Sequence, residues 1–198
     1  MNGAKLQHWS LVLAFIFSSV PAWAAEAEKA TVPNCPAYSL KAENGGDPGS
    51  LPLNNSEVLK WKSSTANQFH SRGHVQGEIV HVYPDRNGHE HFSIRVGGDV
   101  SETLEVVYNQ AFGAIPDPKE GMLVEACGDY ITSTGASPGP NGQVYPASPD
   151  GAIIHWIHFA PSSSGHHSGY MMIDGVLGGS PHGRPEPKRS SPHFRNNR

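Results

Sequence analysis

The sequence predicts a mainly β domain, because apolar side chains in its central part recur at every second position. In residues 91–96, Phe92, Ile94 and Val96 alternate with polar side chains, which is the period of a half-buried strand. The segment PDRNG at 84–88 is a strong turn signal just before them. Five strand-like segments, with a long connection between the third and the fourth, predict a small five-stranded barrel like the oligonucleotide/oligosaccharide-binding (OB) fold. A small β-sandwich is the alternative.

A short helix is expected before the strands, within residues 54–69. Asn55 or Ser56 is available as its N-cap, and Gly73 gives a boundary beyond its end. Gly77 falls in the first strand and is expected to form a bulge or a tight bend there. Residues 133–151 are dense in Gly, Pro and Ser and show no strand pattern, which predicts a loop. The strands are expected at residues 74–82, 91–96, 103–108, 122–131 and 152–159.

The first 24 residues predict a signal peptide. Lys5 gives a short basic start, residues 11–17 form an apolar stretch, and Ala22-Trp23-Ala24 is a small-x-small cleavage pattern. The apolar stretch is far shorter than the ~20 residues that span a bilayer. We therefore expect a periplasmic or secreted protein with no transmembrane segment after cleavage.

The remaining chain is predicted to hold one domain with flexible termini. Residues 25–53 are rich in Pro, Gly and Asn and suggest an extended N-terminal arm, residues 54–179 the β-barrel domain, and residues 180–198 a disordered basic tail. The tail carries a net charge of +4, whereas residues 25–179 carry −9. An acidic body is atypical of a surface that binds phosphates, so nucleic acid is not an expected partner.

Cys35 and Cys127 are the two cysteines of the chain. In an oxidising compartment a disulfide between them is the expected state, and it would attach the N-terminal arm to the domain. Two unrelated buried thiols are the alternative.

Histidines gather near the end of the domain, around the segment IHWIH and the following GHHSGY. Imidazole is a common metal ligand, so His155, His158 and His167 are candidates for a zinc or copper site, with His89 or His91 as a further ligand. Side chains alternate along a strand, so His155 and His158 should point to opposite faces unless the strand is interrupted. The alternative is that these histidines and Trp156 only pack and bond to the backbone.

Signatures of an enzyme are weak. The chain has no P-loop or HExxH motif, and no GxSxG elbow between a predicted strand and a predicted helix. Glu125 and Asp129 share one face of the fourth predicted strand and are interpreted as solvated acids rather than a catalytic pair. The favoured hypothesis is a non-catalytic module for an unknown small ligand or an envelope partner. A metal-binding protein or metal-dependent hydrolase is the alternative, and a purely structural envelope component is a third hypothesis.

Residues 55–177 resemble an uncharacterised family of secreted bacterial proteins, domain of unknown function 3465. The resemblance rests on PDRNGHxxF, Val107-Tyr108-Asn109, GDY, IHWxHxxP and the later Gly-x-His. It implies an OB-like barrel outside the cytoplasm and no known activity. The chain departs from the family at Tyr108, where the family has His, at Phe159, where it has a second His, and in a longer 133–151 loop. The candidate binding residues are His89, Asn109, His155, Trp156, His158, His167 and Tyr170.

Overall fold

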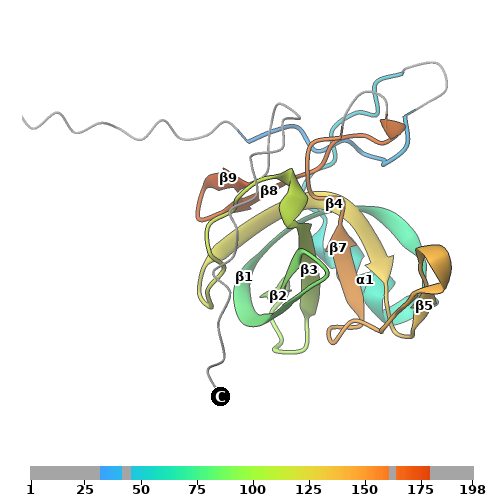
Figure 1. The fold of residues 1–198 in the computed structure, drawn as a ribbon. Coiled ribbons are helices and arrows are strands. Elements are labelled where there is room, and N and C mark those ends of the chain that lie inside the picture. The colour runs from blue at the N-terminus through green and yellow to red at the C-terminus, as the bar shows by residue number, and fades with distance from the viewer. Residues whose placement is uncertain (1–31, 42–45, 161–163, 179–198) are drawn as a thin grey trace, which may run out of the picture.

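Five strands pair in a closed ring in the computed structural model, which describes residues 32–41, 46–160 and 164–178 (Figure 1). Neighbouring strands of the ring are antiparallel, except the strands at residues 103–109 and 152–155, which run parallel to each other. The predicted mainly β fold, with five strands in a ring and one short helix, is confirmed. In ring order the strands are β1 (His70–Arg86), β2 (His89–Arg95), β3 (Thr103–Asn109), β7 (Ala152–His155) and β4 (Leu123–Thr132).

The long strand β1 closes the ring because it pairs with β4 along its first half and with β2 along its second half. The change of partner falls at Glu78, which is paired on both sides. The preceding residue must be glycine, since a Cβ at Gly77 would lie 2.3 Å from the carbonyl oxygen of Arg95. The bulge expected at Gly77 is not there, since Gly77 pairs with Val124 in regular register and the irregular pairing follows at Ile79–His81.

The turn between β1 and β2 is tighter than PDRNG suggested. The strand continues through Pro84 to Arg86, and only Asn87 and Gly88 make the turn, with φ of 53° and 74°. An Asn-Gly pair with two positive φ angles is the favoured two-residue hairpin turn. The predicted strand end at residue 82 was therefore wrong. Strand β1 includes Pro84, whose missing N–H is tolerated at the edge of a sheet.

The helix α1 (Asn55–Ser64) covers one end of the ring. Its N-cap position is Asn54, so the predicted cap at Asn55 or Ser56 was wrong. Both asparagine side chains bind strand backbone instead of capping. The Nδ2 of Asn54 donates to the carbonyl of Arg72, and the Nδ2 of Asn55 donates to that of Gln76 at 2.7 Å. These bonds hold the start of the helix on β1.

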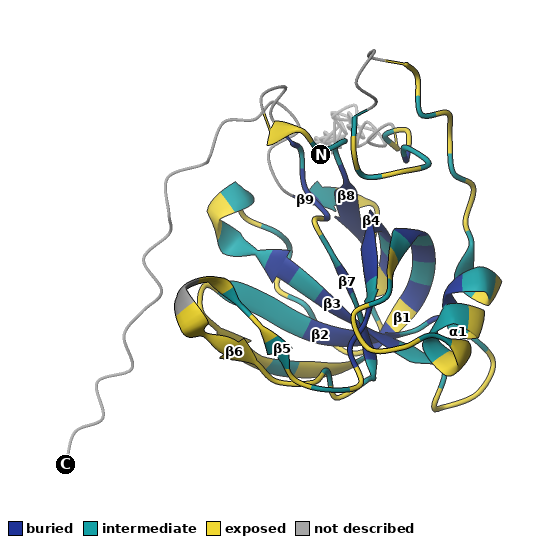
Figure 2. Ribbon diagram, turned by 90° about the vertical axis from the view of Figure 1, so that its right-hand side faces the viewer, coloured by how far each residue is buried: buried dark blue, intermediate teal, exposed yellow. Residues whose placement is uncertain are grey.

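Apolar side chains fill the ring, and the buried segments run along its strands (Figure 2). On the helix, Val58 is buried and Trp61 packs against Phe69 and Tyr130. Burial of this set supplies the main driving force for the fold. The largest fully buried side chains include Tyr108, Tyr130, Phe92, Ile79, Ile94, Leu104, Ile154, Ile157, Met171 and Ile173.

The chain after the ring was predicted less well. The last ring strand ends at His155, not at residue 159, because Trp156 takes a left-handed backbone with φ of 56°. Two strands that were not predicted follow, β8 (Tyr170–Ile173), which pairs with β4, and β9 (Val176–Gly178). The 133–151 loop contains a small hairpin of β5 (Ser137–Pro138) and β6 (Val144–Tyr145) around the 3₁₀ turn η2 (Pro140–Gly142).

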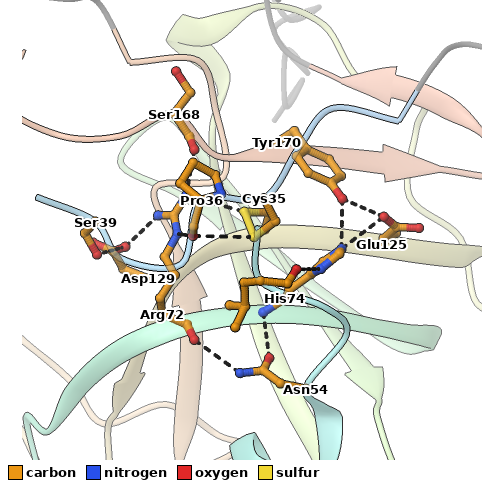
Figure 3. The surroundings of a disulfide bond; sticks show 12 residues. Cys35, Pro36, Ser39, Asn54, Arg72, His74, Glu125, Asp129, Ser168 and Tyr170 are labelled. Carbon is orange, nitrogen blue, oxygen red and sulfur yellow. Dashed lines mark hydrogen bonds and ion pairs between the residues drawn. A yellow bond between two sulfur atoms is a disulfide. The ribbon is translucent and has the colours of Figure 1, made fainter. Parts of the chain in front are cut away.

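The predicted disulfide is confirmed. Cys35 and Cys127 are bonded across a sequence separation of 92, with their Cα atoms 5.6 Å apart. The bond attaches the described part of the N-terminal arm to β4 (Figure 3). Arg72 lies beneath it, donating to the carbonyl of Pro36 and, at 3.4 Å, to the Sγ of Cys127.

The predicted signal peptide at 1–24 and basic tail at 180–198 lie outside the described residues. Within the described part of the chain, no helix has the length and apolar character needed to cross a membrane.

Candidate ligand-binding cleft

A cleft of about 640 Å³ lies between the ring and the 133–151 loop. Its strand residues alternate with the core residues of the same strands. On β3, for example, Glu105 and Val107 line the cleft while Val106 is fully buried in the core. Because successive side chains of a strand point to opposite faces, the cleft lies on the outer face of the ring. Its lining is Gln68, Arg86, Asn87, His89, His91, Glu105, Val107, Ile131, Ser133, Ser137, Pro138, Gln143, Tyr145, Pro146, Ala147, Ser148, Ile153 and His155.

Asp150 fastens the end of the loop to three strand residues. Its carboxylate accepts hydrogen bonds from the hydroxyls of Thr103 at 2.5 Å, Ser93 at 3.0 Å and Tyr83 at 3.2 Å. Burial, and then the negative charge of Asp150, raise the pKa of Tyr83 to about 12, so its hydroxyl stays a donor at neutral pH. The loop therefore has a fixed base although its sequence is rich in Gly, Pro and Ser.

The loop is also closed on itself. The backbone N–H of Ser133 donates to Gly151 and that of Ser148 donates to Ser133. At the tip, the ring of Tyr145 lies over Gly139, where a Cβ would come within 2.4 Å of it. Tyr145 thereby contributes an aromatic ring to the loop side of the cleft.

A carboxylate, an imidazole and a guanidinium meet in the cleft. The side chain of Glu105 is only 3 % exposed, and it accepts a hydrogen bond from Nδ1 of His91 at 2.7 Å and one from Arg86 at 3.3 Å. Burial alone would raise the pKa of Glu105. Hydrogen bonds from His91 and Ser148, and the charges of His91 and Arg86, outweigh burial and lower that pKa. Glu105 is therefore an anion whose charge is already balanced by its neighbours.

His89 and His155 lie side by side at the same cleft, with ring centroids 5.8 Å apart. Nδ1 of His89 is 3.1 Å from the carbonyl oxygen of Asn87. Burial, followed by the nearby His89 and His158, lowers the pKa of His155 to about 4. His155 is therefore uncharged at neutral pH.

Trp156 and His158 lie next to this cleft and outside its lining. Trp156 stacks on His166 with ring centroids 4.9 Å apart and planes 3° from parallel. His158 is buried, stacks on Phe112, and donates from Nδ1 to the carbonyl of its neighbour at 3.0 Å. Burial lowers the pKa of His158. The side chain of His158 thus packs against an aromatic ring and bonds to the backbone.

The lining of the cleft does not include Asn109, His167 or Tyr170, although Asn109 is the strand partner of His89. The side chain of Asn109 accepts from the N–H of Ala111 and so caps η1 (Gln110–Phe112). The ring of His167 lies 5.9 Å from that of Tyr38. The hydroxyl of Tyr170 donates to Glu125 at 2.6 Å (Figure 3), and burial, together with this bond, raises its pKa.

Glu125 and Asp129 are not the solvated acids that the sequence suggested. Asp129 is buried and accepts from Arg72 at 2.8 Å and from Ser39 at 2.5 Å, while Glu125 also faces His74 at 3.1 Å (Figure 3). The interpretation failed because Tyr170 of the neighbouring strand β8 bonds to Glu125 and Ser39 of the arm bonds to Asp129. Neither contact was visible in the alternation of β4.

The three histidines proposed as metal ligands are not gathered at one point. His155 neighbours His89, His158 stacks on Phe112, and His167 packs on the arm. Across the described ranges, no group of three or more His, Cys, Asp or Glu side chains could hold a metal ion.

Sequence reasoning named two of the cleft residues as binding candidates, His89 and His155. It missed Arg86 and Glu105, and it offered His91 only as a further metal ligand beside His89. Glu105 did carry a signal, since a lone carboxylate in the middle of the apolar TLEVVY segment needs a partner when the strand is buried.

Comparisons with family models and with curated proteins found no match to this chain. The resemblance of residues 55–177 to domain of unknown function 3465 therefore stays a prediction.

Proposed function

We propose that this protein is a non-catalytic binding module whose small ligand occupies the cleft between the outer face of the ring and the 133–151 loop. The observation that carries the proposal is the fixed loop over an otherwise open strand face. The cleft has the ~300–1,000 Å³ size of small-molecule sites, at about 640 Å³. Such sites combine apolar and aromatic side chains with a few polar groups, and this lining includes Val107, Ile153 and Tyr145 beside histidine and serine side chains.

The position of the cleft supports the proposal. In OB folds, ligands bind on the face of the second and third strands, beside the loops that follow the first and the fourth strands. Here β2 and β3 contribute His91 and Val107, the hairpin after β1 contributes Asn87, and the 133–151 loop follows β4, the fourth strand of the ring in chain order.

We further propose a periplasmic or secreted location. The disulfide between Cys35 and Cys127 is compatible with an oxidising compartment, where the ligand would be found.

The test fills the cleft without disturbing the core. The purified protein would be screened by two-dimensional NMR against a defined set of monosaccharides, trisaccharides, amino acids and nucleotides. We expect one class to shift the backbone amides of β2, β3 and β7, and the shifts to disappear in a Val107→Trp variant. Val100→Trp is the control, because Val100 is 86 % exposed and lies outside the lining. Binding that maps elsewhere, or that survives Val107→Trp in a folded variant, would contradict the proposal.

A further inference from the structure

The balance of charge in the cleft points to an uncharged ligand. Arg86 is the one Lys or Arg of the lining, and Glu105 is its one carboxylate. Their side chains are 3.3 Å apart, so each compensates the other. A phosphate or carboxylate ligand needs Lys or Arg side chains that are not already paired. A cationic ligand would need a carboxylate that is not already bonded.

The polar side of the cleft offers hydrogen-bond acceptors that lack donors of their own. A carbonyl and a carboxylate only accept, so the Nδ1 atoms of His89 and His91 must donate to Asn87 and Glu105. Where such a ring is neutral, its Nε2 keeps a lone pair that can accept a hydrogen bond. Hydroxyl groups of a ligand can donate to these nitrogens, and serine and glutamine side chains of the lining, among them Ser133 and Gln143, can bond in either sense.

The strand side of the cleft carries three apolar side chains. Ile131 and Ile153 are direct partners in the pairing of β4 with β7. Ile153 in turn pairs with Glu105, two residues from Val107 on the neighbouring strand. Side chains on one face of paired strands lie close together, so the three are near neighbours, with polar side chains beside them: Glu105 is the direct partner of Ile153, and His91 is that of Val107. From the opposite side, the half-exposed Tyr145 supplies an aromatic ring.

Apolar side chains with hydrogen-bonding groups beside them match one common class of molecule. A sugar ring presents a C–H face that packs on apolar or aromatic side chains and hydroxyls around its edge. From this match we propose that the ligand of the cleft is a short uncharged saccharide, an inference that rests on the proposed function. Nucleic acid, the other ligand class of OB folds, is disfavoured because its binding depends on unpaired basic side chains.

Isothermal titration calorimetry would compare three kinds of probe on the full chain. The uncharged probes are the trisaccharides maltotriose, cellotriose and N,N′,N″-triacetylchitotriose. Trigalacturonate has a similar size and carries carboxylates, and a thymidine hexanucleotide tests nucleic acid. We expect at least one uncharged trisaccharide to bind and to shift the β3 and β7 amides in NMR, and both anionic probes to fail.

A pair of histidine variants tests the role of the acceptor nitrogens. Loss of one neutral hydrogen bond, about 1 kcal/mol, corresponds to a Kd about fivefold higher, which we expect for His89→Ala. His81→Ala should leave Kd unchanged, because His81 is exposed and lies outside the lining.

The outcomes separate this inference from the proposed function. If trigalacturonate, the hexanucleotide or a non-saccharide molecule binds in the cleft and the uncharged trisaccharides do not, the inference of an uncharged saccharide is overturned and the binding module stands. If a trisaccharide binds outside the cleft, or with equal affinity to the Val107→Trp variant, both are overturned. If no probe and no molecule of the NMR screen binds, both are likewise overturned.

Discussion

Replacing Asp150 with alanine should destabilise the protein and loosen the 133–151 loop. The carboxylate accepts three hydrogen bonds, and the donors differ in what happens when it is removed. Tyr83 and Thr103 are partly exposed and can turn to water. Ser93 is only 2 % exposed and would be left without its partner. An unsatisfied buried hydroxyl costs about 1–3 kcal/mol, so we expect a loss of about 2 kcal/mol in the free energy of unfolding.

Urea unfolding followed by tryptophan fluorescence measures this loss, and hydrogen exchange measures the loop. Amides of residues 133–148 should exchange faster in Asp150→Ala, while those of the core strands change only by the global loss. Asp117→Ala is the matched control, because the side chain of Asp117 is 85 % exposed, and it should stay within about 0.5 kcal/mol of the unaltered protein. A loss below 0.5 kcal/mol for Asp150→Ala, or unchanged exchange in the loop, would refute the anchoring role.

Three other perturbations test separate parts of the structure. Changing both Cys35 and Cys127 to alanine should cost about 4.5 kcal/mol in urea unfolding, because the bond closes a loop across a separation of 92 residues; a loss under 1 kcal/mol would be inconsistent with this. Glu105 has a lowered pKa when folded, so its ionised form stabilises the fold above the unfolded pKa of about 4.3, and this contribution is lost as the pH falls through the folded pKa. The stability gap between the unaltered protein and Glu105→Gln should therefore be full at pH 7 and shrink below about pH 4, and a gap that stays constant from pH 7 to pH 3 in urea titrations would contradict that linkage. Gly128→Ala should lower the free energy of unfolding by about 3 kcal/mol or prevent folding, since its Cβ would lie 2.3 Å from a carbonyl oxygen. Gly98→Ala has open space and should be near neutral in the same urea unfolding; equal stability of the two variants would contradict this.

The fold could be predicted from the sequence wherever one face of a strand is buried and the other is not. The alternation of Phe92, Ile94 and Val96 is an example, and these side chains are in the core. The prediction failed where both faces are covered or the strand is very short. All four residues of β8 are buried, so Tyr170–Ile173 shows no alternation, and β5 and β6 have two residues each.

The candidate site could be predicted only in part, because a cleft joins residues from elements that are far apart in sequence. The histidine-rich segment pointed to His155, which lines the cleft, and to His158, which packs on Phe112. No local pattern indicated the left-handed backbone of Trp156 between them. The pairing of Glu105 with Arg86 and His91 depends on the register of three strands. Register is set by the pairing of the whole sheet, so side-chain pairs of this kind cannot be predicted from single segments of the sequence.

The central claim is that the cleft over the outer face of the ring binds an uncharged saccharide. Calorimetric titration of the three uncharged trisaccharides into the unaltered protein and into Val107→Trp tests it most directly. The account predicts saturable binding of at least one of them to the unaltered protein and none to the folded variant. Binding that is equal in the two proteins, or found only with trigalacturonate or the hexanucleotide, would contradict it.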